Sequence, residues 1–120
     1  MKLFFTVFLV LNLLAETLAA VSLIGGGLGG EPTDIAAGTR WDMNYGFAVI
    51  AIASAVFWLW TKRSTLAAVT PVLGMLTVFH VSLVVALSMD ASQRFGFILH
   101  GVLALMAIIL FTQRRKWCTD

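Results

Sequence analysis

Four long apolar runs, separated by short polar segments, dominate the pattern of this chain. They cover residues 3–24, 43–60, 66–89 and 95–112. An α-helix of about 20 apolar residues crosses the hydrocarbon core of a bilayer, and a helix satisfies all its own backbone polar groups there. The pattern therefore predicts an all-α fold, a four-helix transmembrane bundle in which residues 1–120 form a single integral membrane domain.

The polar segments between these runs predict the connections. The glycine-rich stretch 25–30 ends the first helix, because glycine is a poor helix former and a flexible connector. Residues 31–42 contain a proline and several small polar residues, which predict irregular structure. A basic hinge at 61–65 and a tight polar turn at 90–94 provide the other two links.

Composition supports the membrane interpretation. Hydrophobic residues make up 60% of the chain and charged residues only 12%, whereas soluble domains carry about 25% charged residues. This excludes an ordinary soluble globule, a nucleic-acid-binding module and a disordered segment, so the lipid bilayer is the expected partner. The one cysteine, Cys118, excludes an internal disulfide and a cysteine-rich metal site.

The distribution of Lys and Arg predicts the orientation. With four spans, the two termini and the middle hinge share one side of the membrane. That side holds six basic residues: Lys2, Lys62, Arg63, Arg114, Arg115 and Lys116. The other side holds Arg40 and Arg94. The positive-inside rule therefore predicts that both termini are cytoplasmic, and the short loops are typical of a protein of the bacterial cytoplasmic (inner) membrane.

A cleavable signal peptide is the alternative interpretation of the first run, since Thr17-Leu18-Ala19 is typical of a cleavage site. The apolar stretch continues beyond this point to Ile24, which is full spanning length. We therefore expect a retained first helix.

Three ionisable residues interrupt the apolar runs: Glu16, His80 and His100. Each costs about 2.5–3.5 kcal/mol to place in the membrane, so each needs a partner or a function. Counted from the outer ends of their helices, they lie at depths of about 12, 14 and 8 Å. All three fall in the outer half of the bilayer, which predicts that they turn inward and form an outward-facing polar pocket.

Asn12 lies one helical turn before Glu16 and shares its face. We therefore predict a ligand-binding or proton-handling site that consists of Asn12, Glu16, His80 and His100. Interhelical hydrogen bonding without further function remains the alternative, because polar side chains in membrane bundles often stabilise packing, and a lone histidine on an apolar face often just bonds a neighbour.

Several ligands suit such a pocket. Two histidines on antiparallel helices are candidate ligands for a non-covalent haem, or for a metal ion in a site completed by Glu16. The depth difference of about 6 Å between His80 and His100 weighs against haem. A quinone or another lipid-like ligand needs only one hydrogen-bonding histidine in an apolar pocket. The sequence contains no nucleophile–base set, so it leaves enzymatic activity open.

Leu14-Ala15-Glu16-Thr17 resembles the segment around the essential glutamate in the first helix of the small multidrug resistance transporters. The resemblance implies a proton-coupled small-molecule exporter in which Glu16 carries the proton. The chain departs from that family in its glycine-rich first loop and its two membrane histidines. A third interpretation is an accessory or assembly subunit of a larger membrane complex, or a homo-oligomer, since small-residue helix faces favour close packing.

The segment from Arg40 to Phe47, which reads RWDMNYGF, also resembles the start of the second helix in small DoxX-like bacterial membrane proteins. This resemblance concerns a general architecture of four short spans with minimal loops. It implies that Arg40, Asp42 and Tyr45 lie at the mouth of the pocket, above Glu16. An interfacial anchor is the alternative role for these residues.

Overall fold

The computed structural model of the chain describes residues 1–24 and 35–120, and the side chains of residues 1–19 and 44–120. The described helices are α1 (Lys2–Ile24), α2 (Ile35–Trp60), α3 (Leu66–Ser88), the short 3-10 helix η1 (Ala91–Gln93), α4 (Arg94–Gln113) and the short 3-10 helix η2 (Arg114–Lys116). The predicted all-α fold is confirmed for the described residues.

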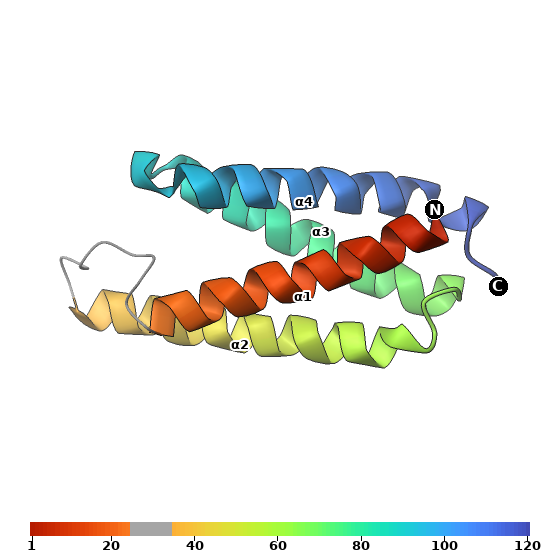
Figure 1. The fold of residues 1–120 in the computed structure, drawn as a ribbon, viewed down its shortest axis with the longest axis horizontal. Helices are drawn as coiled ribbons and strands as arrows, with labels where there is room; N and C mark the ends of the chain where they lie inside the picture. The colour runs from red at the N-terminus through yellow and green to blue at the C-terminus, as the bar shows by residue number, and fades with distance from the viewer. Residues whose placement is uncertain (25–34) are drawn as a thin grey trace.

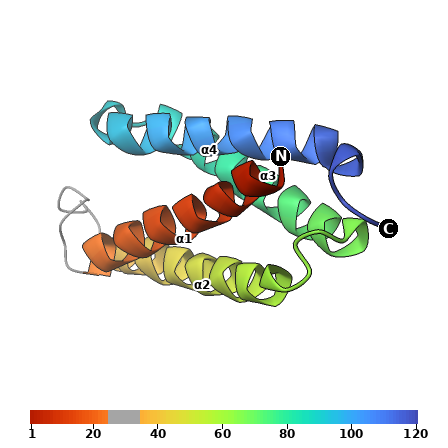
Figure 2. The same ribbon diagram turned by 45° about the vertical axis from the view of Figure 1, so that its right-hand side comes forward.

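The four long helices form an antiparallel bundle (Figures 1 and 2). Neighbouring pairs are α1 with α2, α2 with α3, α3 with α4 and α4 with α1, and the contact between α3 and α4 is the most extensive. The order around the bundle therefore follows the order along the chain, as expected from the short connections. As a result, α1 and α3 face each other across the interior.

Three described segments are long and apolar enough to cross a membrane: Lys2–Ala19, Leu66–Ser88 and Ala91–Lys116. The apolar part of α2, Asn44–Trp60, is shorter. Its 17 residues measure about 25 Å, compared with about 30 Å for the hydrocarbon core. The length and composition of these three helices are those of an integral membrane protein.

The start of α2 differs from the prediction. We expected irregular structure up to residue 42 and a helix from residue 43, but α2 begins at Ile35. Proline disfavours the helical conformation in the residue before it and not in those after it, and the segment after Pro32 contains alanines, the best helix formers. The predicted glycine-rich loop at 25–30 lies outside the described residues.

The two termini and the turn between α2 and α3 lie at the same end of the bundle (Figure 1). There the C-terminal tail contacts that turn, because Thr119 N–H donates to the Ser64 carbonyl at 2.6 Å and Leu66 N–H donates to the Thr119 carbonyl at 2.8 Å. Trp117 is buried against Phe5, with ring centroids 4.9 Å apart. We call this the basic end of the bundle, since it carries Lys2, the α2–α3 turn and η2.

Candidate functional site

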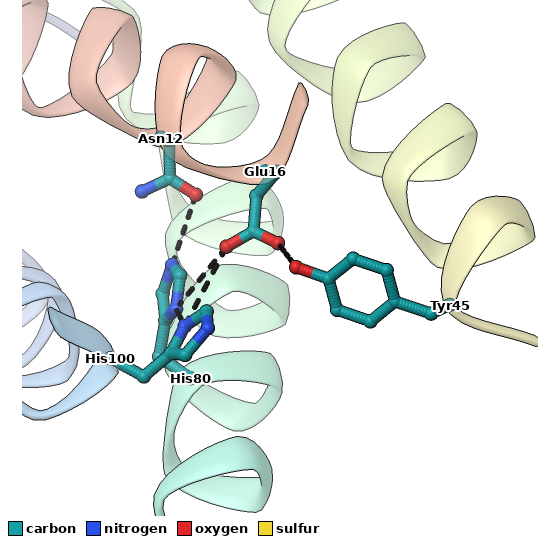
Figure 3. A network of polar contacts seen from close by, with 5 residues as sticks. All are labelled: Asn12, Glu16, Tyr45, His80 and His100. Atoms are coloured by element: carbon teal, nitrogen blue, oxygen red, sulfur yellow. Dashed lines mark hydrogen bonds and ion pairs between the residues drawn. The ribbon is translucent and has the colours of Figure 1, made fainter. Parts of the chain in front are cut away.

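Five polar side chains from all four helices meet inside the bundle (Figure 3). We call this group the central polar cluster; its members are Asn12, Glu16, Tyr45, His80 and His100. All five are buried, and even the most accessible of them exposes only 7% of its surface. The predicted convergence of the glutamate and the two histidines is therefore confirmed.

The helices place these side chains by simple periodicity and packing. Asn12 and Glu16, four residues apart on α1, point from the same face into the bundle. From the opposite side of the interior, His80 of α3 approaches Asn12, with 2.9 Å between Nε2 and the amide Oδ1. This contact bridges two helices that are not neighbours, so the cluster lies at the centre of the bundle.

The contact with Asn12 defines the protonation of His80. Because Oδ1 is an acceptor, Nε2 of His80 carries the proton and donates it, which leaves a lone pair on Nδ1. That Nδ1 atom lies 3.0 Å from Nδ1 of His100. Nδ1 of His100 is therefore the donor in this contact. Phe79 meets both imidazole rings edge-on and provides an apolar wall.

Glu16 presents its two carboxylate oxygens to different partners. Oε2 accepts a hydrogen bond from the Tyr45 hydroxyl. Oε1 is buried without a hydrogen-bond partner among the described residues, and it lies 3.6 Å from Nδ1 of His100 and 4.0 Å from Nδ1 of His80. An unsatisfied buried acceptor costs about 1–3 kcal/mol, so this oxygen requires a physical explanation.

The three central atoms form a triangle suited to a metal ion. Oε1 of Glu16 and the Nδ1 atoms of the two histidines are separated by 3.0, 3.6 and 4.0 Å. A point equidistant from all three lies about 2.1 Å from each, and protein Zn–N and Zn–O bonds measure about 2.0–2.2 Å. The same three residues form the group of potential metal ligands found among the described residues. These three separations match the spacing of ligand atoms around a small divalent cation.

This arrangement does not suit haem ligated by both histidines. Two axial imidazoles bind opposite faces of the iron, with their nitrogens about 4 Å apart and the macrocycle between the rings. Here the two Nδ1 atoms are 3.0 Å apart and the rings stack at 29° with centroids separated by 5.3 Å, which leaves no space for a macrocycle.

The predicted depth difference between the two histidines was wrong. The expected depth of His100 assumes that its helical segment begins at Phe95, but η1 adds a helical turn before α4. His100 lies nine residues after Ala91, where η1 begins, and His80 lies nine residues before Met89, which follows α3. The two rings therefore meet at one level.

Tyr45 is positioned differently from the prediction. It was expected at the mouth of the pocket, but it is buried and bonded to Glu16 within the central polar cluster. The early start of α2 explains this difference, because it places Tyr45 well inside a helix. The side chains of Arg40 and Asp42 lie outside the described residues, so their position at the mouth stays a prediction.

Buried ionisable side chains are confined to one layer of the part of the bundle with described side chains. The buried polar or charged residues there are Asn12, Glu16, His80 and His100. A proton path across a bilayer normally requires polar groups at more than one depth. In the described region, the cluster is therefore built as an isolated site and not as one step of a relay.

Comparisons with protein-family models, curated proteins and solved structures gave no match to this chain. The resemblances to the small multidrug resistance transporters and to DoxX-like proteins therefore stay predictions. The residues of the central polar cluster are the remaining indication of function.

Proposed function

We propose that this chain is a membrane protein that binds one divalent transition-metal ion inside its helical bundle. The ligands are Oε1 of Glu16, Nδ1 of His80 and Nδ1 of His100. The observation that carries the proposal is the convergence of these three buried atoms around a point at metal-bond distance, with Oε1 of Glu16 lacking a hydrogen-bond partner among the described residues. A cation at this point would satisfy that oxygen.

The donor set indicates the class of metal. Two imidazoles and one carboxylate suit Zn²⁺ and Fe²⁺, whereas Cu⁺ prefers thiolate or thioether ligands. Structural zinc sites have four protein ligands, but sites with three protein ligands keep a position open for water or a substrate. The central polar cluster therefore favours a metal ion that can bind an additional small ligand.

Asn12 and Tyr45 provide the outer contacts that such a site requires. A metal-binding histidine usually donates its second N–H to an oxygen, which fixes the tautomer and the ring orientation. The contact of His80 with Asn12 has this form. Tyr45 fixes the carboxylate of Glu16 through the oxygen that does not face the metal position.

The proposal includes a location for the site. The clustering of six basic residues at the end that carries both termini supports cytoplasmic termini, in the cytoplasmic membrane of a bacterium. With that orientation, the central polar cluster lies in the outer half of the bilayer. The exporter alternative has less support because the described part of the bundle has no second layer of buried titratable groups.

A metal titration tests the proposed function. The full chain is purified in mild detergent, stripped with chelator, and titrated with Zn²⁺ and with Co²⁺, whose visible absorption reports nitrogen and oxygen ligation. We expect one ion per chain for the wild type, and loss of stoichiometric binding for Glu16→Gln, His80→Gln and His100→Gln. Asp90→Asn removes a carboxylate outside the cluster and should bind as the wild type does. Absence of stoichiometric binding to the wild type, or unchanged binding to Glu16→Gln, would refute the proposal.

A further inference from the structure

A cavity of about 300 Å³ opens at the basic end of the bundle, and none of its lining residues belongs to the central polar cluster. It lies between the first turns of α1 and the turn that joins α2 to α3. Its lining residues are Lys2, Leu3, Thr6, Thr61, Arg63 and Ser64. Two of them are cationic, three carry hydroxyls and none is acidic, so the cavity has the chemistry of an anion site.

The orientation of Arg63 adds to this argument. Its guanidinium stacks on the Trp60 ring, with 4.9 Å between Cζ and the ring centroid, and one N–H group donates to the Trp60 carbonyl. Guanidinium has five N–H donors in a planar fork, so others remain for an anion. Stacking also holds the side chain in place, which lowers the entropic cost of binding.

The first turn of α1 also contributes positive electrostatic potential at this cavity. This helix begins at Lys2, and its first backbone N–H groups point toward this end. The helix dipole favours negative charge there. Lys62, in the turn between α2 and α3, lies over the ring of Trp58 in α2, with 4.7 Å between Nζ and the ring centroid. A combination of basic and aromatic side chains is typical of the headgroup level of a membrane.

We propose that this cavity binds a phosphate group, with Lys2 and Arg63 as its cationic contacts. Phosphate is the anion that Arg, Lys and hydroxyl groups recognise together. The group can belong to an anionic phospholipid at the membrane surface or to a soluble phosphate compound, and both sources share this chemistry. The inference is independent of the metal site, since it depends on residues at the basic end of the bundle, none of which belongs to the central polar cluster.

The test compares lipid retention by variants with equal charge. Full-length protein is mixed in detergent with phosphatidylglycerol or with phosphatidylcholine of the same acyl chains, and bound lipid is measured by native mass spectrometry. We expect the wild type to prefer phosphatidylglycerol, and the double variant Lys2→Gln/Arg63→Gln to lose about tenfold or more of that binding. The matched control Arg115→Gln/Lys116→Gln removes two exposed charges at the same end and should retain it.

Inorganic phosphate at millimolar concentration distinguishes the two sources. If it raises the thermal stability of the wild type and displaces the lipid, the cavity binds free phosphate as well. If only the lipid binds, the cavity is a headgroup site. The proposal is overturned if the wild type neither prefers anionic phosphatidylglycerol over zwitterionic phosphatidylcholine nor responds to inorganic phosphate, or if the control double variant loses as much binding as Lys2→Gln/Arg63→Gln. Helical content by circular dichroism confirms that each variant is folded.

Discussion

Asn12 and Tyr45 each hold one ligand of the proposed metal in place without facing the metal position themselves. Oδ1 of Asn12 accepts a hydrogen bond from Nε2–H of His80, so Nδ1 of that ring faces Glu16 and His100. Tyr45 bonds one oxygen of Glu16, so the other oxygen is directed inward. Both residues are positioning residues, and their effects can be separated from those of the ligands.

Replacing Asn12 by Ala should weaken Zn²⁺ binding by about 10- to 100-fold, which is the usual effect of losing an outer contact of a histidine ligand. Asn12→Asp keeps an oxygen acceptor for His80 and should retain the affinity. Competition with a chromophoric chelator measures both values. Wild-type affinity in Asn12→Ala would show that this contact serves packing only.

Replacing Tyr45 by Phe should lower the free energy of unfolding by about 1–3 kcal/mol, because the buried Oε2 of Glu16 loses its donor. Denaturant unfolding in mixed micelles measures this difference. Ser82→Ala is the matched control, since it deletes an exposed hydroxyl that bonds only to the backbone carbonyl of Val78. Equal effects of the two substitutions would contradict a special role for the Tyr45 hydroxyl.

At this scale, the sequence predicted that the glutamate and the two histidines converge, but it did not predict the position of Tyr45. The cost of isolated charge in hydrocarbon was sufficient to predict that Glu16, His80 and His100 meet, and the four-residue spacing predicted that Asn12 joins them. Tyr45 was misplaced because a tyrosine near the expected start of a span has the same pattern as an interfacial anchor. Only the true start of α2 distinguishes the two roles.

Among the elements, α3 and α4 form the closest pair, and small residues are the physical reason. A Cβ added at Gly74 would touch Phe111 at 3.7 Å, and one added at Gly96 would meet Leu87 at 3.2 Å. Ala107 is completely buried in the core on the same helix as Gly96. Small side chains allow two helix backbones to approach each other, which is the main source of helix association in membranes.

Ala107→Leu should destabilise the bundle by about 1–3 kcal/mol, since a larger side chain overpacks a filled interface. Gly101→Ala on the same helix should be neutral or slightly stabilising, because an added Cβ there meets nothing within 4 Å. Unfolding midpoints in the same detergent compare the two variants. If Ala107→Leu is as stable as Gly101→Ala, the interface is looser than the structure indicates.

The boundaries of the helices were predictable where apolar residues change abruptly to polar ones. The extent of α1 as far as Ile24 and the polar turn before α4 agree with the expected pattern. The start of α2 was not predictable, because residues 35–42 mix two alanines, which favour a helix, with Gly38, Thr39 and Asp42, which do not. The helix there is decided by its continuity with the apolar part. The 3-10 turn η1 has a local signal, since Asp90 accepts hydrogen bonds from Ser92, but such turns are too short to show a period.

Across the whole molecule, the orientation can be tested with the one natural cysteine. If both termini are cytoplasmic, a membrane-impermeant maleimide should label Cys118 only after the cells are permeabilised. Ser92→Cys in a Cys118→Ser background reports the opposite side and should be labelled in intact cells. Labelling of Cys118 in intact cells, with Ser92→Cys protected, would reverse the topology.

The environment of Cys118 sets the conditions for this experiment. Burial raises the pKa of its thiol, although the charges of Lys2 and Arg114 oppose the shift. Because the thiolate is the reactive form, labelling should slow as the pH falls through the neutral range, and mildly alkaline buffer gives the clearer result. A rate that does not change with pH would indicate a thiol with a lowered pKa.

The proposed ligands lie on the first, third and last of the long helices, and this has a consequence for biosynthesis. Glu16 enters the membrane early, but its histidine neighbours follow only when the second half of the chain has been translated. Until α4 leaves the ribosome, the carboxylate must be protonated, shielded by water or held by the insertion machinery. Nascent chains that stop before His100 should therefore be favoured substrates for membrane quality-control proteases, and completion of the fourth helix should end that vulnerability.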